Sequence, residues 1–462
     1  MYKKIIDSLK NSRKFPYKLI LFLSLIVISP AIFKFLDHSF QKTFGLNRFI
    51  NVIDFIFLGF VSFCFLKKDK LKRYLSLEIG FLVLYLLLAR LSILFSEGEI
   101  HHRAFYDLFK AYILIAVCLL FVSPTFRKHQ KSIVKIFFIL FFTYTVFEVS
   151  IGIMQFILQK PIGFTVFNEP IFSHDLGSCK IRIDTSSAFL LKFLPSQNSE
   201  FLRAHGTFIH PNVFAGFLNV SALLSLYLIY KTKKKLLFSL FLFFQLIALI
   251  LTFSRAGFAA FIISSFLFFF LMGLKKYDVK KMLFVFLTIM LCILAIGSKY
   301  LIERGFLGSF FQSKKAKELN ILSAKTRDSL KDVSINMIEK KPILGIGFRN
   351  FLIKRNEYSK IPVERAYVHN IYLLLGAETG ILTLAIFIAM VLISLINTIK
   401  SSLNPATIIS ICMIVSFLLI GFFDHYPISS TLGRLVLFLN IAFLNFSKSK
   451  YLKFKLSHSI LY

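Results

Sequence analysis

The sequence predicts an all-α polytopic membrane protein of about 12 transmembrane helices, with a large helical loop outside the membrane. Three observations support this fold class. Hydrophobic residues make up 56% of the 462 residues and charged residues only 17%, and the mean hydropathy is +0.73. The apolar residues gather in runs of membrane-spanning length, for which about 20 residues are needed. Short basic segments separate the runs. This composition excludes a soluble enzyme, a disordered chain and a fibrous protein.

Apolar runs mark the expected helices in chain order. They are Lys18–Phe35, Phe49–Leu66, Leu75–Phe95, Leu108–Val122, Ile133–Leu158, Pro211–Tyr230, Leu236–Phe253, Gly257–Leu274, Met282–Gly297, Ile371–Ile399, Thr407–Phe423 and Ile428–Phe446. The first run follows a basic segment, as in a signal peptide, but no small-residue cleavage site comes after it. We therefore expect the first run to be retained as a transmembrane helix.

The basic residues predict the orientation of the chain. Half of the Lys and Arg residues lie at the N-terminus, near Lys400 and in the segments 67–73, 127–135, 231–235, 275–281 and 448–455. These clusters fall in every second loop, and basic loops stay in the cytoplasm. Both termini are then cytoplasmic. The formal net charge of +33 is thus an orientation signal rather than a sign of nucleic-acid binding.

The stretch from Leu236 to Leu274 allows two interpretations. It could form one overlong helix, or two helices joined at Ser254-Arg255-Ala256-Gly257. The basic segments on both sides belong in the cytoplasm, and only two crossings place both of them there. The second interpretation therefore fits better, and it places Arg255 in a tight hairpin on the outer face.

Two outer segments are long enough to carry function. They give the division of the chain: N-terminal helices (1–158), a first outer loop (159–210), a core (211–446) containing the large outer loop 298–370, and a basic cytoplasmic tail (447–462). Within the large loop, the spacing of Leu330, Val333 and Met337 predicts an amphipathic helix over Ser323–Glu339.

The first candidate motif runs from Arg203 to Asn212, at the outer surface and directly before an apolar run. It contains His210, and Pro211 suits the first turn of a helix. The Gly and Pro residues of this segment could simply shape a junction between a loop and a helix. The charged and imidazole groups of Arg203 and His210 are harder to explain in that way.

Two arginines on the outer face are candidates for phosphate binding, because a guanidinium offers paired donors in a fixed fork. Arg255 lies in the predicted hairpin, although an arginine at the end of a span often only reaches the interface. Arg327 lies on the predicted loop helix, one turn before Leu330, and could also be a solvated helix charge.

A further motif, Tyr367-Val-His369-Asn370, precedes the apolar run that starts at Ile371. The N-terminus of a helix carries a partial positive charge that favours a bound phosphate and keeps His369 neutral. Alternatively, Asn370 caps the helix and His369 is incidental. Glu378 lies inside the span, where a carboxylate is usually functional or paired, and it could anchor an arginine.

These groups all fall on one face of the membrane. Arginines and a histidine without an acidic cluster can bind a lipid-linked diphosphate without metal and activate a hydroxyl group. The five cysteines have no metal-ligand or disulfide spacing. We therefore expect no cofactor and no metal.

Taken as an ordered set, the motifs resemble the O-antigen ligase and O-antigen polymerase superfamily. The set comprises Arg203, Gly206-Thr207-Phe208, Pro211-Asn212, Ser254-Arg255-Ala256-Gly257, Arg327, Pro342-Ile-Leu-Gly345-Ile-Gly347, His369-Asn370 and Glu378-Thr379-Gly380. This similarity implies a fold like that of the polyprenyl-phosphate-dependent (GT-C type) glycosyltransferases. It also implies an enzyme of the bacterial inner membrane whose active site faces the periplasm.

The resemblance implies a function as well. The donor would be a glycan on undecaprenyl diphosphate, and the acceptor a hydroxyl of lipid A-core or of a growing glycan; membrane lipids are further partners. The reaction would be metal-independent and inverting. Arg255 and Arg327 match functional arginines of the family, and His369 matches its essential histidine. Arg203, His210, Asn212, Asn370 and Glu378 are the expected substrate-binding residues.

The resemblance does not decide which member of the superfamily this protein is. An O-antigen ligase is favoured, since the outer loops lack the pair of Arg-x10-Gly segments associated with some O-antigen polymerases. His210 stands where many relatives have Asn, which leaves a polysaccharide polymerase as the alternative. A protein O-oligosaccharyltransferase is a third option. Outside the superfamily, a lipid-linked oligosaccharide flippase or transporter is the remote alternative, because several charged residues lie within spans.

Overall fold

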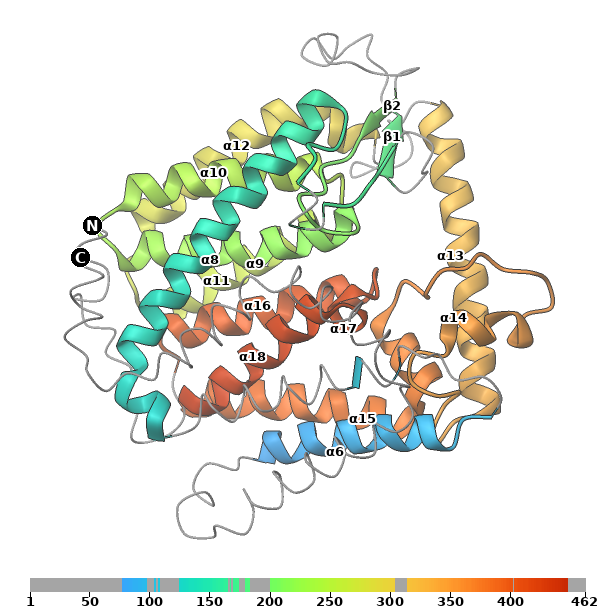
Figure 1. Cartoon of the computed structure of the whole chain (residues 1–462). Helices are drawn as coiled ribbons and strands as arrows, with labels where there is room; N and C mark the ends of the chain where they lie inside the picture. The colour runs from blue at the N-terminus through green and yellow to red at the C-terminus, as the bar shows by residue number, and fades with distance from the viewer. Residues whose placement is uncertain are drawn as a thin grey trace.

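The computed structural model describes residues 77–97, 104, 107–108, 124–164, 167, 169–173, 179–182, 200–303, 314–401 and 403–447, and these are largely α-helical. The elements are α6 (Leu77–Leu94), α8 (Pro124–Leu158), β1 (Lys180–Arg182), β2 (Glu200–Leu202), α9 (Pro211–Lys231), α10 (Lys235–Leu251), α11 (Arg255–Leu274), α12 (Lys280–Glu303), α13 (Lys314–Lys340), α14 (Phe351–Lys354), η6 (Arg355–Tyr358), α15 (Ile371–Ser401), α16 (Pro405–Gly421), α17 (Tyr426–Ser429) and α18 (Thr431–Ser447). Figure 1 shows their arrangement.

The described helices agree with the predicted apolar runs from Leu75 onward, apart from Leu108–Val122. That run and the two before Leu75 lie almost entirely outside the described residues, so the total of about 12 stays a prediction. Within the described part of the chain, four helices are long and apolar enough to cross a membrane. They are Phe138–Leu158, Pro211–Lys231, Arg255–Leu274 and Ile371–Lys400, and three shorter apolar helices accompany them: Gly80–Leu94, Lys235–Leu251 and Pro405–Gly421.

Three details differ from the expectation. The first outer loop contains a small antiparallel sheet, in which Ile181 of β1 lies opposite Phe201 of β2. Helix α12 continues to Glu303, so the large outer loop begins later than residue 298. The last apolar run is broken near Ser430 into the short helix α17 and the longer α18.

The stretch between Leu236 and Leu274 forms two helices, as the distribution of basic residues predicts. Helix α10 ends at Leu251, and α11 begins at Arg255. Ser254 caps α11, because its Oγ accepts a hydrogen bond from the backbone N–H of Gly257 at 3.3 Å. The turn between the helices includes Phe253 at a positive φ of 51°. Arg255 therefore begins a helix directly after a tight turn.

Helix α9 lies at the centre of the bundle, against α10, α11 and α16. A polar bridge crosses this core. The Asn219 amide donates to the carbonyl of Gly257 at 2.7 Å and accepts from Ser416 Oγ at 2.8 Å. A Cβ added to Gly257 would lie 2.8 Å from the methyl group of Ala215, so Gly257 allows α9 and α11 to approach closely. The glycine of the Ser-Arg-Ala-Gly motif is thus a packing residue.

Helix α15 is interrupted at Gly380, whose φ of 84° is not helical. The segment before α14 pairs with this interruption. Ile346 donates to the carbonyl of Ala377 at 2.9 Å, Gly347 donates to that of Glu378 at 3.0 Å, and Ile381 donates to that of Pro342 at 2.7 Å. The Pro-Ile-Leu-Gly-Ile-Gly and Glu-Thr-Gly motifs are therefore joined by backbone hydrogen bonds, which connect the large loop to a transmembrane helix.

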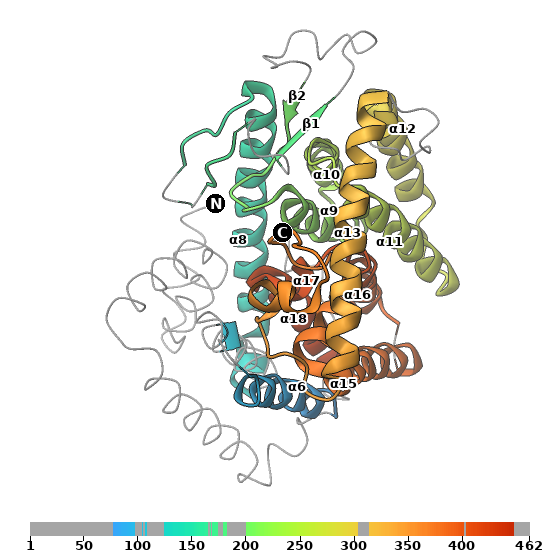
Figure 2. The same ribbon diagram turned by 90° about the vertical axis from the view of Figure 1, so that its right-hand side faces the viewer.

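Helix α13 lies across one end of the bundle (Figures 1 and 2). Its predicted apolar face is confirmed, although the helix starts before Ser323. Leu330, Val333 and Met337 are buried in one cluster with Leu374 of α15 and Val368 of the preceding loop. Burial of these three side chains fixes the rotation of α13 about its own axis. Any other rotation would expose them to water and lose the hydrophobic stabilisation.

We predict that Gly380→Ala destabilises the protein. The added Cβ would lie 1.9 Å from the carbonyl oxygen of Ile343 and would have to occupy a positive φ. Such strain costs about 1–3 kcal/mol or more. Thermal unfolding in detergent should show a lower melting temperature. Gly273→Ala is the control, since no atom lies within 4 Å of its added Cβ. Equal melting temperatures for the two variants would show that the backbone contact at Gly380 is not required for stability.

Candidate functional site

The candidate residues gather at the end of the bundle that α13 crosses. Helices α9, α11 and α15 begin at this end, while α10 and α16 finish there, because consecutive helices run in opposite directions. Figure 2 looks onto this end, with α13 lying in front of the bundle. The predicted site residues thus come from four helices, α9, α11, α13 and α15, and from the loops that precede α9 and α15.

A cluster of His369, Asp424 and His425 lies at the centre of this end. One potential ligand atom of each residue lies within 4.8 Å of the others. The imidazole rings of His369 and His425 have centroids 5.7 Å apart. His425 Nδ1 lies 2.6 Å from Ser429 Oγ, which fixes the orientation of that ring. His369 Nδ1 is buried without a hydrogen-bond partner in the described part of the chain.

Sequence reasoning identified His369 but missed Asp424 and His425. Both residues lie in the short connection between α16 and α17, which the sequence shows only as a polar break between two apolar runs. One signal was available: a carboxylate and a histidine are adjacent in a hairpin on the same predicted face as His369. This signal is weak, because polar residues are common in hairpins between transmembrane helices.

The Asp424 carboxylate joins this cluster to the first motif. Its Oδ2 accepts a hydrogen bond from the Asn212 side-chain amide at 2.6 Å, and its Oδ1 accepts from the His425 backbone N–H at 2.7 Å. Asn212 Oδ1 in turn accepts from Arg203 at 2.8 Å, and Arg203 Nε donates to the carbonyl of Thr252 at 2.7 Å. Asn212 therefore holds Asp424 directly, and Arg203 holds Asn212 in place.

His210 has a local structural role. It is the N-cap of α9, and its Nδ1 accepts from the backbone N–H of Asn212 at 3.1 Å. Burial and the nearby charge of Arg203 lower the pKa of His210 to about 3. A neutral imidazole is the form that can accept this capping hydrogen bond.

The two predicted phosphate-binding arginines lie near each other, and one of them lies near the histidine cluster. Arg255 begins α11, Arg327 lies on α13, and both side chains are half-buried. Their positive charges are close enough to repel each other. Arg327 also acts electrostatically on His369. Two guanidinium groups from different helices are thus near each other, and Arg327 is also near His369. The predicted role of both arginines in phosphate binding stays a prediction.

The charges around His369 determine its protonation. Burial lowers the pKa of His369 below 6.5, and the positive charge of Arg327 lowers it further, while Asp424 opposes the shift. Burial would raise the pKa of Asp424, but its histidine neighbours and the Asn212 donor hold that pKa below its usual value of 3.8. The favoured state at neutral pH is a neutral His369 beside an ionised Asp424.

Asn370 and Glu378 have scaffold contacts. Asn370 Oδ1 caps α15 by accepting from the backbone N–H groups of Tyr372 at 2.9 Å and Leu373 at 3.0 Å. Its amide donates to the carbonyl of Phe422 at 3.3 Å, beside Asp424. Glu378 is buried and accepts from the backbone N–H of Phe351 at 3.3 Å. These contacts place Glu378 under the large loop, and its predicted role in substrate binding stays a prediction.

Helix α8 holds the segment 203–210 from behind. Gln155 Oε1 accepts from the backbone N–H groups of His205 at 3.0 Å and Gly206 at 2.8 Å, while its amide donates to the carbonyl of Gly206 at 2.8 Å. Glu148 accepts from the backbone N–H of Thr207 at 2.8 Å. A Cβ on Gly206 would lie 2.3 Å from Glu148 Oε2. Sequence analysis showed Glu148 only as a charged residue within a span, and it did not identify Gln155.

A comparison with protein families gives a match for part of this site. Residues 238–388 match the family model described as O-antigen ligase. This domain is thus similar to the O-antigen ligase superfamily. The predicted resemblance is thereby confirmed, while no curated protein matches the chain. The family's ligases and polymerases are glycosyltransferase-like membrane enzymes that act on lipid-linked glycans and acceptors.

The O-antigen ligase match covers about a third of the chain, and this third includes Arg255, Arg327, His369, Asn370 and Glu378. The groups that orient Asp424, and Asp424 itself, lie outside it. The ligase superfamily segment thus contributes the cationic half of the site. The helices on either side contribute its carboxylate and the hydrogen bonds that hold it.

The histidine cluster offers atoms that could hold a metal ion. Its surroundings suit a cation poorly. Both Asp424 oxygens already accept hydrogen bonds. Arg327 adds positive charge beside His369. The donor set therefore fits proton transfer better than metal coordination.

We predict that Gln155→Leu destabilises the protein and loosens the segment 203–210. The change leaves the buried N–H groups of His205 and Gly206 without their acceptor, at a cost of about 1–3 kcal/mol for each group. Hydrogen–deuterium exchange should rise over residues 203–210, and the melting temperature should fall. Met154→Leu is the control, because the Met154 side chain on the same helix is exposed. Unchanged exchange in the Gln155 variant would show that α8 does not support the segment.

Proposed function

We propose that this protein is a membrane glycosyltransferase that moves a glycan from undecaprenyl diphosphate to an acceptor hydroxyl at the outer face of the inner membrane. The acceptor is lipid A-core, which makes the protein an O-antigen ligase. The observation that carries the proposal is the placement of His369 beside Asp424, at the same end of the bundle as Arg255 and Arg327.

The arginines bind the donor in this mechanism. Two guanidinium groups that repel each other in the free protein are stabilised by a diphosphate between them. During transfer, the bond between the anomeric carbon and the phosphate oxygen breaks, and its electron pair stays on the diphosphate. Arg255 and Arg327 stabilise this growing negative charge, each charged hydrogen bond contributing about 1.5–3 kcal/mol. In this way they do the work that a metal ion does in other transferases.

His369 acts on the acceptor. Its neutral imidazole accepts the hydroxyl proton while the acceptor oxygen forms a bond to the anomeric carbon on the face opposite the diphosphate, which inverts that centre. The imidazolium formed in this step lies beside Asp424, whose negative charge stabilises it. Asn212 contributes indirectly, since its hydrogen bond favours the ionised form of Asp424, and Arg203 orients Asn212.

The sidedness of the proposal follows from the helix ends. The basic segments at Lys231–Lys235 and Lys275–Lys281 join α9 to α10 and α11 to α12. They lie at the ends of these helices opposite the Ser254 turn and Arg255. If the basic segments are cytoplasmic, the site faces the periplasm, and the predicted even number of spans then places both termini in the cytoplasm.

We predict that His369→Ala lowers the rate of glycan transfer about 10²–10⁴-fold, because it removes the base. In the wild-type protein, the transfer rate should fall as the pH drops through the His369 pKa. The acid limb of the pH–rate profile therefore lies below pH 6.5. Asp424→Asn should lower the rate less, by roughly 10-fold. It should also move the limb to lower pH, because Asp424 raises the His369 pKa.

These rates require purified protein in vesicles, a lipid-linked glycan donor and a core acceptor. Lys360→Ala is the control, since this exposed lysine lies in the same loop. Wild-type transfer by the His369 variant at equal protein levels would refute the mechanism. An acid limb that moves to higher pH in Asp424→Asn would refute the role of the carboxylate.

The choice between ligase and polymerase has a direct genetic test. We predict that a strain lacking the protein accumulates long glycan on undecaprenyl diphosphate while lipid A-core stays bare. The measurement is a gel of surface glycan and lipid-linked glycan, with restoration by the wild-type chain but not by His369→Ala. Single repeat units on lipid A-core without long chains would instead identify a polymerase. Unchanged pools would favour a transporter.

A further inference from the structure

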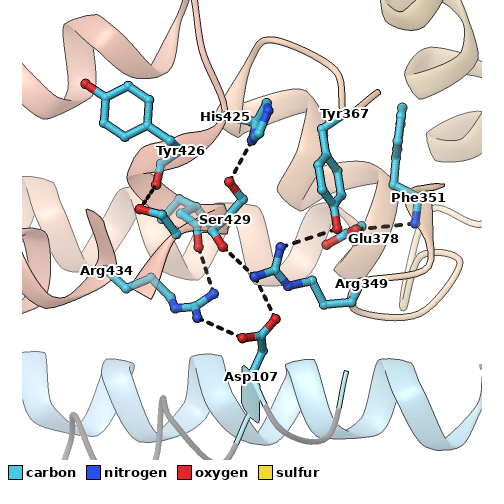
Figure 3. A network of polar contacts seen from close by, with 11 residues as sticks. Asp107, Arg349, Phe351, Tyr367, Glu378, His425, Tyr426, Ser429 and Arg434 are labelled. Carbon is cyan, nitrogen blue, oxygen red and sulfur yellow. Dashed lines mark hydrogen bonds and ion pairs between the residues drawn. The ribbon is translucent and has the colours of Figure 1, made fainter. Parts of the chain in front are cut away.

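A buried group of charged residues lies next to the candidate site and has no part in the mechanism above (Figure 3). Asp107 accepts from two arginines: Arg349 Nη2 lies 2.7 Å from one carboxylate oxygen, and Arg434 Nη2 lies 3.5 Å from the other. All three side chains are largely shielded from solvent. Buried charges are costly unless they are paired with good geometry, so this group requires an explanation.

Arg349 connects two segments that are far apart in the sequence. Its Nη1 donates to the hydroxyl of Tyr367 at 3.3 Å, and its Nη2 donates to the backbone carbonyl of Ser429. Tyr367 comes two residues before His369. Ser429 ends α17, the short helix that follows Asp424 and His425. One guanidinium therefore contacts both the loop that carries His369 and the helix next to Asp424.

The same two segments also contact each other directly, around His425. Ser429 Oγ bonds to His425 Nδ1 at 2.6 Å. The Tyr367 and His425 rings lie 5.0 Å apart, and the His425 and His369 rings lie 5.7 Å apart. A displacement of Ser429 or Tyr367 would therefore change the distance between His369 and the Asp424–His425 pair.

The other two members of the group hold Arg349 in place. Arg434 of α18 donates to the carbonyl of Ile428 at 2.9 Å, so α17 receives hydrogen bonds from two arginines. Asp107 compensates part of their charge, and the buried Glu378 interacts electrostatically with Arg349. Arg349 itself has a positive φ of 69°, a backbone conformation that residues other than glycine rarely adopt. Its contacts compensate for that strain.

We propose that Arg349 is a positioning residue that sets the distance between His369 and the Asp424–His425 pair, with Asp107 and Arg434 as its anchors. The proposal rests on the proposed glycan transfer for its effect on rate, but the contacts themselves can be tested without it. Lys cannot replace Arg349, because one ammonium group cannot reach Asp107, Tyr367 and Ser429 in the planar geometry of a guanidinium.

The test compares Arg349→Lys and Tyr367→Phe with Arg355→Gln. Tyr367→Phe keeps the ring that faces His425 and removes only the hydroxyl that accepts from Arg349. Arg355 is the matched control, because it also fastens the large loop through hydrogen bonds, here to the carbonyls of Leu352, Val363 and Glu364. These hydrogen bonds of Arg355 involve neither Tyr367 nor α17.

The first measurement is hydrogen–deuterium exchange of the full-length protein in lipid nanodiscs. We expect Arg349→Lys to raise exchange over 363–370 and 425–430 together, and Arg355→Gln to raise it only near 352–365. The second measurement is transfer. Arg349→Lys should lower kcat about 10²-fold and Tyr367→Phe about 10-fold, as small misplacements of reacting groups do, while KM for the lipid-linked donor stays within twofold. Arg355→Gln should keep kcat within twofold.

Three outcomes would overturn the proposal. They are exchange that rises over only one of the two segments in Arg349→Lys, wild-type kcat in both Arg349→Lys and Tyr367→Phe, or an equal loss of kcat in Arg355→Gln. Failure of the proposed function would look different: wild-type protein and His369→Ala would then give equal transfer. The exchange of the two segments would still decide whether Arg349 connects them.

Discussion

The buried carboxylate of Asp424 is the contact on which the arrangement of the site depends. It accepts hydrogen bonds from Asn212 at the start of α9 and from the backbone beyond α16, and it faces His369 before α15. Three helix ends thus converge on one negative charge. A buried carboxylate is costly unless it accepts hydrogen bonds, so its donors are constrained to remain in contact with it.

Local signals in the sequence predicted much of this structure. The positions of the helices follow from runs of apolar residues, and the buried face of α13 follows from the spacing of Leu330, Val333 and Met337. The two helices on either side of Ser254 follow from the sidedness of basic segments. His369 and Asn370 were identifiable because a polar pair directly before a long apolar run marks a helix N-terminus.

Contacts between distant segments could not be predicted in the same way. Asp424 acquires its role only when α16 ends beside α9, and the motif around Gly345 acquires its role only when α15 is interrupted at Gly380. Both depend on pairs of residues far apart in the sequence, for which hydropathy gives no signal. Glu378 is an intermediate case: a carboxylate in a span indicates a partner, but it does not say which one.

The short helices next to the site have a consequence for its depth. Helices α10 and α16 have 17 residues each, so each is about 26 Å long, several ångströms less than a typical hydrocarbon core. Such hydrophobic mismatch is relieved by thinning of the bilayer or by sinking of the helix ends. In either case the end that carries Asp424 meets the lipid headgroups below their usual level. In the proposed transfer, the diphosphate of the lipid donor would then reach the arginines while its hydrocarbon chain stays in the membrane.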